Sequence, residues 1–191
     1  MHSFSSSIVS LLALVGMACA QQPISLFDGQ TLKGWQAITC QAEVVDGAIC
    51  IKAGNGFLLA DKTYGDFVFE CDWKALNTNM WDSGIYFRVD TLPAPGAKFP
   101  WPKQYQVNLR KGEEGAIGGA DKAKCSALFK KGVWNHFKLT VKGECAELDF
   151  NGEKAWTKKG ITPARGHFCL QAEVPGGGQF LFKNLTMIEL P

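Results

Sequence analysis

The stretch Phe67-Val68-Phe69-Glu70-Cys71-Asp72-Trp73-Lys74 decides the fold class. Phenylalanine, cysteine and tryptophan occupy every second position, and the positions between them are mostly polar. Because successive side chains of a β-strand point to opposite faces, this alternation predicts a strand with one face in a core and the other at the surface. A helix would instead repeat its apolar residues every three or four positions. The stretch therefore predicts β-structure.

The same period of two recurs in segments 85–89, 105–109, 137–141 and 168–174. Asp46-Gly47 and Asn151-Gly152 are typical two-residue hairpin turns, in which both central residues need a positive φ. We find no convincing helical stripe. A chain of 191 residues fits one domain, and closely spaced turn signals favour a sandwich. We therefore expect a single-domain, all-β jelly-roll sandwich.

Residues 1–20 predict a secretory signal peptide. They contain no Asp, Glu, Lys or Arg, and the apolar segment 8–15 is followed by Ala18-Cys19-Ala20. The apolar run is too short to cross a membrane, so we expect residues 21–191 to form an exported domain, periplasmic or extracellular, without a transmembrane segment. Retention of an acylated Cys19, as in a lipoprotein, is the alternative.

Charge and cysteine content narrow the function further. The formal net charge is only +2, and no run of Lys or Arg stands out, so we expect no nucleic-acid partner. Seven cysteines, one of them Cys19, suggest at least one disulfide in an exported chain, with the pairing left open. A buried thiol is the alternative for Cys71, which shares a strand face with Phe69 and Trp73. The cysteine spacing matches no zinc motif.

Three predicted strands carry unusual polar faces. Their side chains are amides, a carboxylate and a guanidinium, which make directional hydrogen bonds to hydroxyl groups. These residues are Tyr86 and Arg88; Gln104, Gln106 and Asn108; and Gln171 and Glu173. Trp81, Trp101 and Tyr86 offer flat apolar walls for sugar rings. The pattern predicts a carbohydrate groove, with ordinary pairing of amides on a strand as the alternative. A proline-rich loop, 91–103, joins two of these strands.

Several short motifs, in order along the chain, carry a resemblance to a known family. They are Ser25–Trp35, Val45–Gly47, Gly65–Glu70, Asp82–Arg88, Trp134–Leu139 and Phe182–Leu185. Together they resemble the 3-keto-disaccharide hydrolase domain, a concanavalin A-like jelly roll. The resemblance implies action on sugars already oxidised at C3, whose ketone acidifies the C2 proton. A base removes that proton, the C1 aglycone leaves, and water adds to the product. A divalent cation is a possible Lewis acid in this chemistry.

The resemblance also implies roles for individual residues. Glu173 stands where the family has a histidine and becomes the candidate general base. Arg88 matches a family arginine and becomes the stabiliser of the enolate or ketone. Glu70 matches an acidic position and becomes a second acid or a partner of Arg88. Gln104 stands where the family has a glutamate, which removes one carboxylate.

Two alternatives remain open. Glu173 and Arg88 could form an ion pair on a face without catalysis, in which case the domain is a carbohydrate-binding or surface-interaction module. Glu70 and Glu173 could instead serve as the two carboxylates of ordinary glycoside hydrolysis. Convergence of Glu173, Glu70 and Arg88 on one cavity would favour the enzyme.

Overall fold

Eleven β-strands make up most of the computed structural model, which describes residues 21–94 and 96–191. The strands are β1 (Ile24–Ser25), β2 (Trp35–Val45), β3 (Ala48–Tyr64), β4 (Phe67–Ala75), β5 (Gly84–Val89), β6 (Gln106–Asn108), β7 (Asn135–Lys142), β8 (Cys145–Phe150), β9 (Glu153–Lys159), β10 (Gly166–Val174) and β11 (Phe180–Glu189). One short helix, α1 (Lys122–Ala127), lies between β6 and β7. The predicted signal peptide and Cys19 lie outside the described residues.

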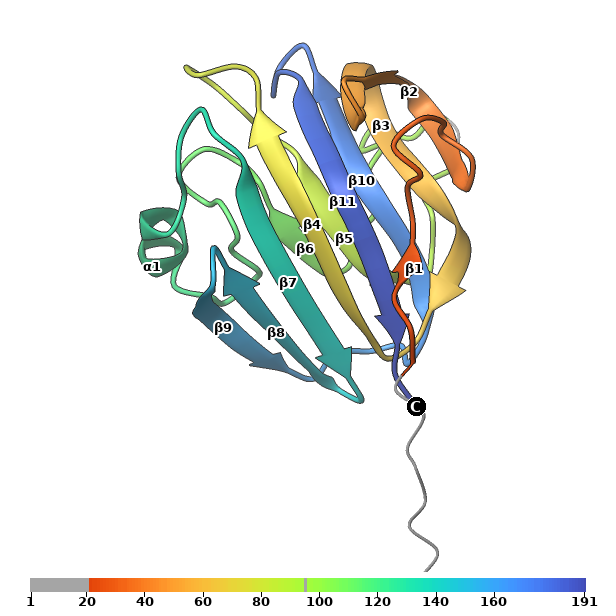
Figure 1. The fold of residues 1–191 in the computed structure, drawn as a ribbon, viewed down its shortest axis with the longest axis vertical. Helices are drawn as coiled ribbons and strands as arrows, with labels where there is room; N and C mark the ends of the chain where they lie inside the picture. Colours follow the sequence, from red (N-terminus) through yellow and green to blue (C-terminus); the bar gives the residue numbers. More distant parts are fainter. Residues whose placement is uncertain (1–20, 95) are drawn as a thin grey trace, which may run out of the picture.

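The strands form one curled antiparallel sheet in the order β6-β5-β10-β3-β11-β4-β7-β8-β9. The long strand β3 joins its two halves: residues 49–51 pair with β11, and residues 54–64 pair with β10. Strand β2 lies along the other edge of β3, and β1 pairs with β11. Figure 1 shows β5 and β6 behind β4, β7 and β11, so the sheet folds over itself into two layers.

The core fills the space between these layers. Phe69 of β4 and Phe168 of β10 have ring centroids 4.6 Å apart, and Phe67 of β4 lies 6.3 Å from Phe87 of β5. These strands are not neighbours in the sheet, so the contacts are made across the sandwich. The residues that alternate in the 67–73 stretch, Trp73 included, are fully buried, as the pattern predicts. The prediction of an all-β jelly-roll sandwich is confirmed.

The two predicted hairpin turns have the expected backbone. Asp46 and Gly47 have φ values of 49° and 73° and join β2 to β3, while Asn151 and Gly152 have φ values of 51° and 86° and join β8 to β9. An asparagine or aspartate followed by glycine accommodates these left-handed conformations with little strain. Both hairpins therefore follow from local sequence.

A bulge in β5 breaks the predicted alternation. Between the pairs Cys169–Tyr86 and His167–Val89, strand β10 contributes one residue and β5 contributes two. Arg88, one of the two, has a φ of 51°. An extra residue reverses the face to which later side chains point. Val89, expected in the core, consequently joins an apolar cluster on the outer face, and Arg88 turns inward.

The cysteines of the described chain are free thiols, so the expected disulfide is not formed in this structure. Cys71 lies on the core face of β4, consistent with the alternative of a buried thiol, and Cys169 lies in the apolar cluster on the outer face. Burial raises the pKa of both thiols. Within residues 21–94 and 96–191, no helix has the length and apolar character needed to cross a membrane.

Candidate functional site

The outer surface of β10, β5 and β6 gathers most of the polar residues that the sequence singled out. Tyr86 lies opposite Cys169 on one side and Gln106 on the other, and Gly84 lies opposite Asn108. Alternation along β10 places Gln171 and Glu173 on the same face as Cys169. We call the face formed by Gln106, Gln171, Glu173 and the adjoining Asp82 the outer polar face.

Two amides and a carboxylate form a hydrogen-bonded chain across this face. Gln106 Nε2 donates to Gln171 Oε1 at 2.5 Å, and Gln171 Nε2 donates to Glu173 Oε2 at 3.0 Å. Gly84 makes room for the chain, because a Cβ there would stand 2.2 Å from Gln106 Nε2. The three side chains are therefore held in one orientation, and Gln171 is almost fully buried beneath its neighbours.

Glu173 belongs to a cluster of carboxylates beside this chain. Burial, followed by the negative charge of Glu173, raises the pKa of Asp82 to about 6, and Arg110 opposes the shift. Burial likewise raises the pKa of Glu173, again opposed by Arg110. Arg110 Nε lies 3.6 Å from Asp82 Oδ2. Burial therefore disfavours the ionised form of both carboxyls, and the positive charge of Arg110 offsets part of that effect.

The loop after β10 fixes Asp82 close to the end of that strand. The Asp82 amide donates to the Gly177 carbonyl at 2.8 Å, and the Gly177 amide donates to the Glu173 carbonyl. A Cβ on Gly177 would stand 2.2 Å from the Asp82 carbonyl oxygen, so this close approach requires glycine. Asp82, which precedes β5, is thereby tied to Glu173, which nearly ends β10.

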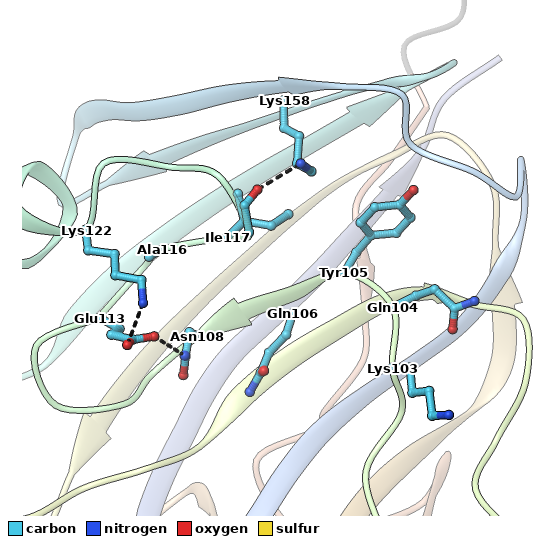
Figure 2. Close-up of a pocket in the computed structure, with 11 residues that line it drawn as sticks. Lys103, Gln104, Tyr105, Gln106, Asn108, Glu113, Ala116, Ile117, Lys122 and Lys158 are labelled. Atoms are coloured by element: carbon cyan, nitrogen blue, oxygen red, sulfur yellow. Dashed lines mark hydrogen bonds and ion pairs between the residues drawn. The ribbon is translucent and has the colours of Figure 1, made fainter.

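A hollow of about 490 Å³, which we call the edge pocket, adjoins the outer polar face at β6. Gln104, Gln106 and Asn108 line one side of it, and Ile117 and Lys158 line the other (Figure 2). The remaining lining residues are Lys103, Tyr105, Glu113, Ala116, Gly118 and Lys122. Its volume suits a small ligand such as a mono- or disaccharide.

The proline-rich loop encloses a second hollow, also of about 490 Å³. Phe99 in its wall is 66% exposed, and Trp101 donates from Nε1 to the Ala172 carbonyl at 2.9 Å. Gln104 lines both hollows and donates to Asp90 Oδ1 at 2.7 Å. Trp101 is thus positioned against β10, within reach of a ligand on the outer polar face.

Arg88 does not join the site. Its guanidinium is fully buried and donates to the Gly65, Gly143 and Pro163 carbonyls and to Asp66 Oδ1, the last at 2.6 Å. The bulge that turns Arg88 inward explains why the expected outward position is wrong. The partner of Arg88 is Asp66, and neither the proposed ion pair with Glu173 nor the proposed contact with Glu70 is formed.

Glu70 and Trp81 also lie away from the site, whereas Tyr86 lies beside Gln106 but is buried. Glu70 lies on the outer face of β4, 3.7 Å from His136 and 3.8 Å from Lys138, among different neighbours from Glu173. Trp81 is buried and donates to Glu114 at 2.9 Å, so it offers no wall for a sugar. Tyr86 is also buried, in the outer apolar cluster, and burial raises its pKa.

The donor set does not fit a metal site built by the protein. Among the side chains of residues 21–94 and 96–191, no group of three or more His, Cys, Asp or Glu gathers as ligands would. Gln104 stands where the family has a glutamate, and an amide is a weaker ligand for a hard cation than a carboxylate, so this replacement also disfavours a metal site. We therefore derive no step through a metal ion.

Sequence reasoning missed Asp82 as a member of the carboxylate pair and missed Arg110 entirely. The sequence names Asp82 only as the first residue of the Asp82–Arg88 motif. Its signal was its position directly before a strand with a polar face. Arg110 follows β6 by two residues and gave no signal of its own.

The fold defines a class, the jelly-roll β-sandwiches. The chain belongs to the family of 3-keto-α-glucoside-1,2-lyase-like domains, whose family model matches residues 22–188. No curated protein matches the chain.

Solved structures agree on the fold. A crystal structure of a proposed glycosyl hydrolase from Parabacteroides distasonis has a TM-score of 0.71 and 18% identity, with 88% of this chain and 94% of that chain covered. The carbohydrate-binding module CBM66 from Bacillus subtilis has a TM-score of 0.59 at 15% identity, covering 82% and 96%. A β-glucanase from Bacillus licheniformis has a TM-score of 0.56 at 14% identity, covering 91% and 100%. At these identities the likeness establishes the fold alone.

Proposed function

We propose that this protein cleaves the glycosidic bond of 3-keto-glycosides on its outer polar face. The observation that carries the proposal is the Asp82–Glu173 pair, in which burial raises both pKa values and Arg110 partly offsets the charge. Elimination next to a ketone needs a base for the C2 proton and an acid for the departing oxygen. A neighbouring pair of carboxyls, one ionised and one protonated, would provide both.

Glu173 is the proposed base and Asp82 the proposed acid. Glu173 takes the C2 proton, the electron pair forms a C1–C2 double bond, and the C1–oxygen bond breaks as Asp82 protonates the aglycone oxygen. In the second half, Asp82 takes a proton from water, the water oxygen bonds to C1, and Glu173 returns its proton to C2. Each carboxyl thus recovers its starting state. Gln106 and Gln171 would hold sugar hydroxyls and keep Glu173 oriented.

Release of 4-nitrophenol from 4-nitrophenyl 3-keto-glucoside, with the unoxidised glucoside as control, tests the proposal. We expect release from the keto substrate only. A positioned general base contributes about 10²–10⁴-fold, so Glu173→Gln should lose activity by that order. Asp82→Asn should also lose activity. Glu70→Gln is the matched carboxylate control on another face and should retain it. Loss in Glu70→Gln with activity kept in Glu173→Gln would reject the assignment.

A carbohydrate-binding module is the second candidate, and one observation favours it. Exposed Phe99 and half-buried Trp101 flank an open hollow beside the polar face, an arrangement that suits stacking on sugar rings. Saccharide binding without release from either glucoside, lost in Trp101→Ala, would support this function over catalysis. We also propose export of the chain, on the sequence of residues 1–20; fractionation of cells that produce the full chain tests this.

A further inference from the structure

The edge pocket has an unusual charge balance. Three lysines line it, Lys103, Lys122 and Lys158, against one carboxylate, Glu113. We propose that this pocket binds the anionic substituent of a saccharide, a carboxylate or a sulfate ester, and so selects charged sugars. The inference deepens the proposed function and rests on saccharide recognition at the adjoining outer polar face.

The single carboxylate of the pocket is already engaged. Glu113 Oε1 accepts from Lys122 Nζ at 2.7 Å, and Glu113 Oε2 accepts from Asn108 Nδ2 at 3.0 Å. Figure 2 shows the contacts of Glu113 with Lys122 and Asn108 at one end of the pocket. Glu113 and Lys122 therefore neutralise each other, and the net positive charge of the pocket comes from the two other lysines.

Lys158 is the better placed of these two. It is half-buried on the edge strand β9, and its Nζ donates to the Gly118 carbonyl at 2.8 Å. This partner is neutral, and within residues 21–94 and 96–191 neither Lys158 nor Lys103 forms an ion pair with a carboxylate. The hydrogen bond to Gly118 fixes the ammonium in the wall, with donors left for a ligand. A half-buried, positioned cation binds an anion more strongly than a freely moving surface lysine.

The position of the pocket also sets the direction in which a ligand would lie. Gln106 and Asn108 line the pocket, and Gln106 continues through Gln171 to Glu173. Asp82 and Glu173 do not line the pocket, and their negative charge would repel an anion. A saccharide would therefore place its charged substituent toward Lys158 and its neutral ring over the amides, toward the carboxylates.

Calorimetry on the full chain at pH 7.5 with three probes tests the proposal: 4-nitrophenyl β-D-glucuronide, 4-nitrophenyl 6-O-sulfo-β-D-glucoside and the neutral 4-nitrophenyl β-D-glucoside. We expect at least one anionic probe to bind more tightly than the neutral one, with an advantage that shrinks as sodium chloride is added. The stronger anion identifies carboxylate or sulfate as the preferred group. None of the probes carries a 3-keto group, so the result does not depend on turnover.

Two variants separate the pocket from general charge. Lys158→Gln should weaken binding of the anionic probe roughly three- to tenfold and leave the neutral probe unchanged. Lys159→Gln removes the same charge from the neighbouring residue, which does not line the edge pocket, and should bind like the parent. Three results would overturn the proposal: equal affinity for all probes, no binding of any probe at low millimolar concentration, or a preference for the anionic probe that survives in the double variant Lys158→Gln/Lys103→Gln. If the parent protein prefers the anionic probe but does not cleave the 3-keto substrate, only the proposed reaction is rejected and the charged pocket stands.

Discussion

Replacement of Arg88 by methionine should lower the free energy of unfolding strongly and leave saccharide binding unchanged. The guanidinium is wholly buried and supplies donors to three backbone carbonyls and to Asp66. Removing one partner of a buried ion pair costs about 3–5 kcal/mol, because the groups left behind are unpaired. Asp66 is 26% exposed and can regain some water, so we expect the lower end, about 3–4 kcal/mol.

Urea unfolding, followed by tryptophan fluorescence, measures this loss. With a slope of about 2 kcal/mol per molar urea for a domain of this size, the midpoint should fall by about 1.5–2 M. Arg88→Lys keeps the charge but not the planar fork and should fall between the parent and Arg88→Met. A shift below about 0.5 M, together with lost saccharide binding, would mean that Arg88 serves the ligand and that its structural role is misread.

Three further perturbations follow from the contacts at the site. The raised pKa of Asp82 means that its ionisation opposes folding, so the stability that the protonated Asp82 contributes is present below pH 4 and is lost as pH rises through about 6. Asp82→Asn should therefore be more stable than the parent by about 1–2 kcal/mol above pH 7 and equal to it near pH 4. Melting experiments across that pH range measure the difference. Gly84→Ala should displace the whole Gln106 side chain, because the new Cβ would stand 2.2 Å from its Nε2 and 2.7 Å from its Cγ, and so it should lower the melting temperature and weaken saccharide binding; unchanged binding in calorimetry would contradict the role of the amide chain. Trp81→Phe removes a donor from the buried carboxylate Glu114 and should cost about 1–3 kcal/mol without altering saccharide binding, which separate unfolding and calorimetry measurements would check.

The strands and turns were predictable because their signals are local. The alternation in 67–74 gives the buried face of β4 directly, and Asn151-Gly152 specifies its hairpin. The polar members of the site were also predictable, since Gln106, Gln171 and Glu173 share the parity of the outward positions on their strands. Their hydrogen-bonded chain confirms that the structure brings them together, although their roles in binding and catalysis stay predictions.

Arg88 could not be placed from the sequence, because its orientation depends on an extra residue in β5 relative to β10. A bulge is a property of two paired strands, and nothing in the segment 84–89 alone reveals it. Trp81 and Tyr86 were wrong as sugar walls for a related reason: the sequence alone does not show whether an aromatic near polar residues is exposed or buried, and both are buried. Asp82 meets Arg110 through backbone hydrogen bonds from Leu109 to Ser83 and from Lys111 to Trp81, and it meets Glu173 through the loop at Gly177; all of these contacts are tertiary.

The bulge at Arg88 has a consequence for how this sequence can change over generations. Arg88 lies near the end of β5 and Asp82 just before its start, so the buried guanidinium stands one strand length away from the carboxylates. Substitutions at Asp82 or Glu173 leave the buried guanidinium and its carbonyl partners untouched. Such an architecture lets the residues around Asp82 and Glu173 change, losing or exchanging a carboxylate, while the domain keeps folding. If this end binds the ligand, as we propose, its specificity can change without a compensating substitution elsewhere.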